Sequence, residues 1–134
     1  MSDVNDRVPG VVDCTPLPSE AGAECFRGND ARTGRAVTLK IFGSVQDDEQ
    51  FARFSDAARA VRSISSHPNI APLVDAGITA DRHPYVVVDH APRRLTDLVA
   101  EQGNLRWQEV VALGTELSSA LSAAHRAGVV HGDV

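Results

Sequence analysis

Residues 35–42 have the sequence RAVTLKIF, in which β-branched and aliphatic side chains predominate, as is typical of a β-strand. Side chains alternate along a strand, so Lys40 is expected on the face opposite Leu39 and Ile41. Lys40 is the single lysine of the chain, which otherwise uses 12 arginines. Lysine is a compact point charge and arginine a wide planar fork, so this position is a candidate for a function that arginine cannot serve.

The segments on either side of this strand extend it into an antiparallel sheet. Before it, from residue 11 onward, short apolar pieces such as ECFR (24–27) and turn clusters such as GNDARTG (28–34) predict a hairpin or meander. After it, two further strands are expected near PLVDAGI (72–78) and YVVVDH (85–90), with a turn between them.

Other parts of the chain have the period of helices. Residues 47–65 begin with acidic residues, which suit the positive end of a helix, and then carry apolar residues at spacings of three and four. A short helix is expected over residues 95–103 and a long one over 107–127, followed by Gly128 as a left-handed cap. The apolar stripe of the long helix consists of Val110, Leu113, Leu117, Leu121 and Ala124.

Charge and composition exclude several classes of protein. The net charge of -5 argues against a duplex nucleic-acid partner, which needs a basic surface. No apolar run approaches the roughly 20 residues of a membrane-spanning helix, and the N-terminus lacks the apolar core of a signal peptide. The histidines and cysteines show no metal-ligand spacing. Cys14 and Cys25 alone make no disulfide framework, so we expect free thiols and a cytoplasmic location.

Four stretches of the sequence occur in the order found in one protein family. They are AVTLK (36–40), HPNIAPLVDAG (67–77), PYVVVDHAP (84–92) and ALSAAHRAGVVHGDV (120–134). Together they resemble the N-terminal half of a bacterial protein kinase domain of the eukaryotic-like, or Hanks, Ser/Thr type. The resemblance implies an α+β fold, with a five-stranded antiparallel small lobe that contains one helix, followed by the first two helices of the large lobe.

The resemblance also implies how the chain is divided. Residues 1–10 are polar and are expected to form a flexible N-terminus. Residues 11–91 would form the small lobe, with its helix at 47–65 and a hinge near 89–92. Residues 92–134 would begin a large lobe that is incomplete.

Roles for individual residues follow from the same resemblance. AVTLK stands where the family has V-A-I-K, so Lys40 is expected to act in catalysis by holding the α- and β-phosphates of ATP. Asp133, within the HGD of residues 131–133, falls on the catalytic aspartate. The residues expected to contact the nucleotide are Leu17, Cys25, Thr38, Lys40, the gatekeeper Val88, and the hinge backbones of Asp89 and Ala91. ATP and Mg²⁺ are the implied cofactors, but the family's Mg²⁺ ligands follow the catalytic aspartate, so no metal ligand is expected in this chain.

The glycine-rich loop of the family is not preserved. Its pattern falls on PSEAGAEC (18–25), where Pro18, Glu20 and Ala23 replace the three motif glycines. Without glycine a loop cannot approach phosphates closely, and Glu20 places a negative charge near a polyanion.

The helix glutamate that pairs with the lysine in active kinases is also missing. Its position falls on Ala57 or Ala58, and the neighbouring Asp56 would point about 100° away on an ideal helix. We therefore expect weak nucleotide binding or none, and no phosphoryl transfer by this chain. The arginines of APRRL (91–95) are interpreted as solvated charges.

Three functions stay open at this point. The first is ATP-dependent phosphorylation of protein Ser/Thr, with this chain as an inactive part and a protein as substrate. The second is a pseudokinase-type module that binds a regulatory protein partner. The third is a small-molecule phosphotransferase of the aminoglycoside-kinase kind, which shares the fold and uses HGD rather than HRD. An exposed apolar face on helix 107–127 would in addition favour self-association.

Overall fold

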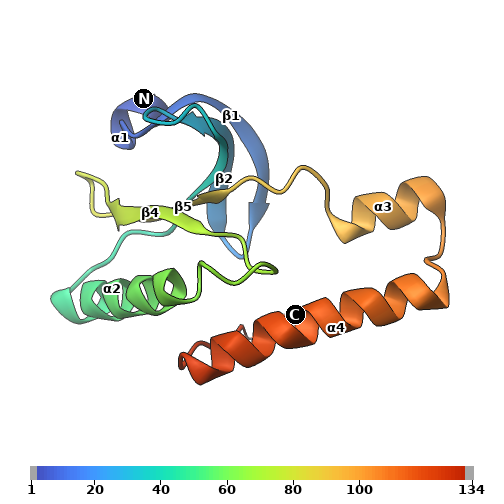
Figure 1. The fold of residues 1–134 in the computed structure, drawn as a ribbon. Coiled ribbons are helices and arrows are strands. Elements are labelled where there is room, and N and C mark those ends of the chain that lie inside the picture. Colours follow the sequence, from blue (N-terminus) through green and yellow to red (C-terminus); the bar gives the residue numbers. More distant parts are fainter. Residues whose placement is uncertain (1–2, 132–134) are drawn as a thin grey trace.

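The computed structural model describes residues 3–131, which form a curved antiparallel sheet with helices around it (Figure 1). The strand order is β1-β2-β3-β5-β4, and all neighbouring strands are antiparallel. The strands are β1 (Val11–Glu20), β2 (Ala23–Asp30), β3 (Ala36–Ile41), β4 (Leu73–Ile78) and β5 (Pro84–Asp89). The helices are α1 (Val4–Arg7), α2 (Asp48–Ser63), α3 (Leu95–Gln102) and α4 (Trp107–Arg126). The α+β fold with a five-stranded antiparallel sheet is confirmed.

β3 lies at the centre of the sheet and shows the alternation that its sequence predicted. Val37, Leu39 and Ile41 are buried on one face, whereas Thr38 and Lys40 lie on the other and are only partly buried. The remaining fully buried members of the core are Val8, Val11 and Val87. β3 therefore separates an apolar core from a face that carries the lysine.

The N-terminal segment corrects the expectation of a flexible lead over residues 1–10. From residue 3 onward it has defined structure, because Val4–Arg7 form α1 and the side chain of Asp3 caps this turn. Val8 is 2% exposed and belongs to the core, against which Val4 also packs. The segment is polar in composition, so its sequence did not indicate that Val4 and Val8 would contact the core. Their i, i+4 spacing puts both side chains on one face of a helical turn.

A two-residue turn joins β1 to β2. Its residues Ala21 and Gly22 both have positive φ angles, 49° and 79°, as type I′ hairpins require, and Glu20 pairs with Ala23 on either side of it. Glycine adopts such angles readily, but alanine does so at a cost in free energy. The turn leaves no spare residue, so Glu20 is fixed at the end of β1.

α2 lies against β4 and β5, below them in Figure 1, and none of its residues is fully buried. The side chain of Asp47 caps its N-terminus, and the helix ends at Ser63, within two residues of the predicted end. Phe54 of α2 contacts Phe42, which follows β3, with ring centroids 6.3 Å apart. The helix is therefore predicted well by its sequence, although it packs lightly.

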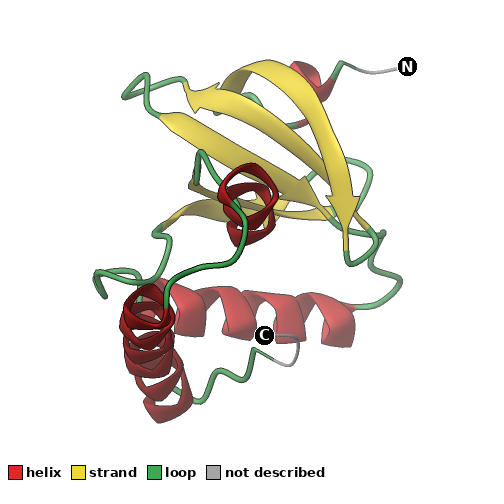
Figure 2. Ribbon diagram, turned by 90° about the vertical axis from the view of Figure 1, so that its right-hand side faces the viewer, coloured by secondary structure: helices red, strands yellow, loops and turns green. Residues whose placement is uncertain are grey.

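α4 lies below the sheet in both ribbon views (Figure 1, Figure 2). Two hydrogen bonds tie it to the loop after α2: His67 Nε2 lies 3.1 Å from Ser119 Oγ, and Asn69 Nδ2 donates to the carbonyl of Glu116 at 3.2 Å. Gly128 follows the helix with φ 77°, the left-handed conformation that its sequence position predicted.

Much of the apolar surface of α4 is open to solvent. The most exposed side chains are Trp107, Val110, Val111 and Leu117, which are 72%, 53%, 58% and 47% exposed. Ala124 is buried, and Leu113 and Leu121 are partly buried. No helix within residues 3–131 combines the length and the apolar character that crossing a bilayer requires.

Candidate functional site

A cavity of about 530 Å³ lies along the face of β3 that carries Lys40. Its walls come from β1, β2, β3, the end of β5 and the start of α3. All seven residues expected to contact a nucleotide line it, namely Leu17, Cys25, Thr38, Lys40, Val88, Asp89 and Ala91. The structure brings these residues together, and their role in binding stays a prediction.

Strand register explains why these distant residues meet. Cys25 pairs with Leu17 of β1 and with Lys40 of β3, and Thr38 pairs with Val88 of β5. Residues directly opposed in antiparallel strands project to the same face of the sheet. The cross-strand partners of Lys40 and Thr38 therefore lie on the same face of the sheet as Lys40 and line the cavity with it.

At one end of the cavity, Lys40 forms an ion pair with Glu20. The Nζ of Lys40 lies 2.7 Å from Oε2 of Glu20, and the other carboxylate oxygen, Oε1, accepts a hydrogen bond from Nη2 of Arg94. The side chains of Lys40 and Glu20 are 31% and 38% exposed, so solvent screens this pair in part. One carboxylate thus bridges two cations.

The two cations hold the pKa of Glu20 below the ordinary value of a glutamate. The largest cause is the side-chain hydrogen bond from Lys40; partial burial opposes it, and the charges of Lys40 and Arg94 lower the pKa further. Glu20 is therefore ionised at neutral pH and balances positive charge in the cavity.

α2 does not supply the partner of Lys40. Ala57 and Ala58, at the position of the family's glutamate, carry no charge. Asp56 pairs instead with Arg59 at 3.1 Å, and both side chains are more than 70% exposed. The carboxylate comes from the β1–β2 hairpin, a pairing that sequence reasoning missed although it placed Glu20 near the phosphates.

The other end of the cavity is formed by the chain that follows β5. The hydroxyl of Thr38 lies 2.9 Å from Nδ1 of His90. The amide of Asp89 donates to the carbonyl of Pro72 at 3.1 Å, so it is engaged within the fold. The amide of Ala91, by contrast, has no partner among the described residues. Among these groups, Ala91 is the one free to bind a ligand through its amide.

Arg94 corrects the interpretation of APRRL as solvated charges. Its side chain is 51% exposed but binds Glu20. Arg94 is the N-cap residue of α3, and its amide donates to Oδ2 of Asp97 at 3.2 Å. The sequence feature that could have indicated this contact is the position of Arg94 just after the predicted hinge, because the chain continues along the cavity there.

Asp133 lies outside the described residues, and its catalytic role stays a prediction. Within residues 3–131, no group of three or more His, Cys, Asp or Glu side chains is placed to hold a metal ion. Cys14 and Cys25 are free thiols, as expected.

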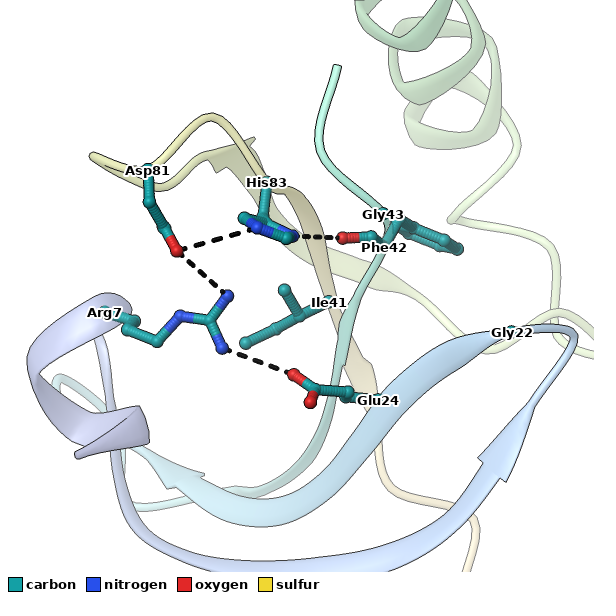
Figure 3. A pocket seen from close by; sticks show the side chains of 8 residues that line it. All are labelled: Arg7, Gly22, Glu24, Ile41, Phe42, Gly43, Asp81 and His83. Atoms are coloured by element: carbon teal, nitrogen blue, oxygen red, sulfur yellow. Dashed lines mark hydrogen bonds and ion pairs between the residues drawn. The ribbon is translucent and has the colours of Figure 1, made fainter. Parts of the chain in front are cut away.

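A second cavity, of about 420 Å³, lies on the other face of β3, beside Ile41 (Figure 3). Arg7 lies between two carboxylates there: its Nη1 donates to Glu24 at 3.3 Å, and its Nη2 lies 3.6 Å from Oδ2 of Asp81. His83 lies beside Asp81, with 3.6 Å between Nε2 and Oδ2. The two terminal nitrogens of Arg7 are paired, whereas its buried Nε has no partner among the described residues. The pairs tie α1 to β2 and to the β4–β5 turn, so we interpret this cluster as structural.

Several bacterial protein kinases have sequences similar to this chain. The serine/threonine-protein kinase PknK of Mycobacterium tuberculosis is 37% identical over 101 residues, and PknL of the same organism is 39% identical over 121 residues. These matches cover 75% and 88% of this chain but 9% and 30% of the two relatives. No protein-family profile matches the chain.

Solved structures with the same fold are protein kinase domains. A structure of the M. tuberculosis PknI kinase domain has a TM-score of 0.74 at 25% identity and is covered to 52%, with 92% of this chain included. A second structure of that domain has a TM-score of 0.76 at 24% identity, with 56% and 100% covered. The chain thus spans about half of these kinase domains and less than a third of the curated relatives. In sequence and in fold, the chain corresponds to the N-terminal half of a bacterial Hanks-type Ser/Thr protein kinase domain.

Proposed function

We propose that this chain is the ATP-binding part of a bacterial Ser/Thr protein kinase. The observation that carries the proposal is the cavity, in which Lys40 lies at one end and apolar side chains such as Leu17 and Val88 line the walls. Apolar walls suit an aromatic base, and a lysine suits phosphate groups. The relatives are serine/threonine-protein kinases, which supports protein hydroxyl groups as the phosphate acceptors of the whole protein.

The described residues fit ATP better than they fit Mg²⁺. A magnesium ion takes oxygen ligands in octahedral geometry and needs free carboxylates. The carboxylates of Glu20 and Asp97 already accept hydrogen bonds from within the chain. Asp89 is paired with Arg35 through Oδ2, which leaves only its buried Oδ1 without a partner, and one carboxylate oxygen is too few for an octahedral site. We therefore propose that residues 3–131 bind the nucleotide and that the Mg²⁺ ligands are not among them.

Binding is expected to be weak, because Glu20 engages Lys40 at a loop position that is glycine in the family pattern. Mg-ATP at about 5 mM should raise the melting temperature by no more than about 3 °C, the shift that a Kd of about 1 mM gives. Lys40→Met should abolish the shift. Arg53→Met, which removes an exposed cation of α2, is the matched control and should keep it. Equal shifts in wild type and Lys40→Met would contradict binding at this cavity.

A regulatory, pseudokinase-type module is the second candidate. It is favoured by the engagement of Lys40 with the hairpin and not with α2. A phosphoryl-transfer assay with γ-labelled ATP separates the two: we expect no label on the chain or on an added protein substrate. Label that is lost in Lys40→Met would exclude this candidate. For either role we propose the cytoplasm, which the free thiols favour.

We also propose that the chain self-associates through α4. The exposed Trp107, Val110 and Val111 form apolar surface of the kind that marks an interaction site. Sedimentation at about 50 µM should show oligomers, since weak contacts form at such concentrations. Val111→Glu should reduce them, whereas Gln108→Glu, which adds the same charge to the same helix, should not. A monomer at this concentration would contradict the proposal.

A further inference from the structure

We infer that Lys40 and Arg94 form one anion-binding site for the phosphates of a nucleotide, and that the Glu20 carboxylate competes for this site. The inference rests on the proposed ATP binding and adds a second phosphate-binding residue and an autoinhibitory one. Neither the relatives' names nor the family's motif assigns Arg94 or Glu20 such a role.

The geometry shows that the two cations converge on one small anion. Oε2 of Glu20 lies 2.7 Å from Nζ of Lys40, and Oε1 accepts the hydrogen bond from Nη2 of Arg94. Each oxygen of one carboxylate therefore serves one cation. A phosphate group offers the same arrangement of paired anionic oxygens, and both lysine and arginine bind phosphate well.

The backbones that carry this cluster are held by the fold. Lys40 lies within β3, and Arg94 is the N-cap residue of α3, where its amide donates a hydrogen bond to Asp97. Glu20 ends β1 next to the two-residue turn, with Ala23 as its cross-strand partner. The strand pairing shifts register between Leu17 and Glu20, and Glu20 is again paired at the turn. The carboxylate that contacts the cations is therefore carried by a paired strand end.

Solvent exposure makes exchange between the carboxylate and a ligand feasible. Lys40, Glu20 and Arg94 are 31%, 38% and 51% exposed, and all three line the same cavity. Exposed ion pairs each contribute a factor of at most about 5 to an equilibrium, so two pairs weaken phosphate binding by about 3- to 30-fold. Glu20 thus lowers the affinity of the two cations for phosphate but does not prevent phosphate from binding.

The test compares ADP with adenosine, which lacks phosphates, by NMR titration of the full chain. In Glu20→Gln the affinity for ADP should rise by about 3- to 30-fold, and the affinity for adenosine should stay the same. Glu24→Gln is the matched control, because it removes the same charge from the neighbouring strand but on the opposite face, where Glu24 binds Arg7. It should change neither affinity. Adding Arg94→Gln to Glu20→Gln should lower the ADP affinity again by about 2- to 5-fold.

Each other outcome is decisive. If Glu20→Gln leaves ADP binding unchanged, or strengthens ADP and adenosine equally, the competition is wrong while nucleotide binding stands. If Arg94→Gln has no effect on ADP in the Glu20→Gln background, Arg94 is not part of the site. If neither ligand binds to any variant, the proposed ATP binding fails, and the inference fails with it.

Discussion

Two ion-pair clusters lie beside the β1–β2 hairpin, and their charges are arranged in opposite ways. Along the large cavity one carboxylate, Glu20, bridges the cations of Lys40 and Arg94. On the other face of β3 one cation, Arg7, bridges the carboxylates of Glu24 and Asp81. The bridging group is 38% exposed in the first cluster and 18% exposed in the second. We therefore expect a cluster whose bridging group is largely buried to stabilise the fold, and one whose bridging group is more open to influence ligand binding in the cavity.

The largest effect is expected when the bridging arginine is removed. Arg7→Ala should lower the free energy of unfolding by about 1–2 kcal/mol, because the arginine is only 18% exposed and loses its packing together with both ion pairs. Its partners Glu24 and Asp81 are 63% and 57% exposed, so solvent screens the pairs themselves in part. Urea denaturation followed by circular dichroism measures the loss.

Two further variants show whether this loss is specific to Arg7. Arg53→Ala breaks a pair on α2 in which both side chains are 74% exposed, so it should cost less than about 0.5 kcal/mol. Lys40→Met should likewise change stability little, since its pair is open to solvent. If Lys40→Met destabilised the fold as much as Arg7→Ala, the two clusters would not differ in role.

An intermediate effect is expected at the turn that both clusters share. Ala21 has a φ of 49°, so Ala21→Gly should raise the free energy of unfolding by about 0.5–1 kcal/mol through relief of strain. Ala23→Gly, two residues later at a buried strand position, should lower it by about as much. Equal effects of the two variants would show that the turn is unstrained.

The smallest effect is the dependence of the Glu20 cluster on pH. The folded-state pKa of Glu20 is lowered, so its stabilisation is present above the unfolded pKa, about 4.3, and is lost as the pH falls through the folded pKa. The stability difference between wild type and Glu20→Gln, at most about 1 kcal/mol at pH 7, should shrink as the pH falls below the unfolded pKa and vanish once the folded-state carboxyl is protonated. Thermal unfolding of both proteins from neutral to acidic pH tests this. A difference that does not change with pH would assign it to another interaction of Glu20.

Local patterns predicted most of the fold. The alternation of residues 35–42 assigned the two faces of β3, and the acidic start of residues 47–65 placed α2 to within two residues. Local patterns failed at the N-terminus, where Val8 becomes buried and Val4 partly buried only because the sheet offers them an apolar surface. A single helical turn carries too few residues to show a period in the sequence.

The part of the candidate site that could be predicted from the sequence is the part whose residues are determined by the alternation of side chains in β3. Leu17, Cys25 and Thr38 line the cavity because they share a face with Lys40 through the register of the sheet. The pairing of Glu20 with Lys40 and with Arg94 spans 20 and 74 residues of sequence, so it depends on the turn and on the path of the chain after β5. Neither is encoded in a short motif.

Glu20 stands at a position that the family's loop pattern fills with glycine. Both glutamate codons, GAA and GAG, become glycine codons by a single A-to-G change at the second base. Such a change would remove the carboxylate from Lys40 and Arg94. It would also place glycine in the loop, which can adopt a wider range of backbone conformations than glutamate. One transition mutation therefore separates a lysine that is paired within its own chain from one that is available to an anion, so the stronger nucleotide binding that we infer for a chain without this carboxylate is a single base change away.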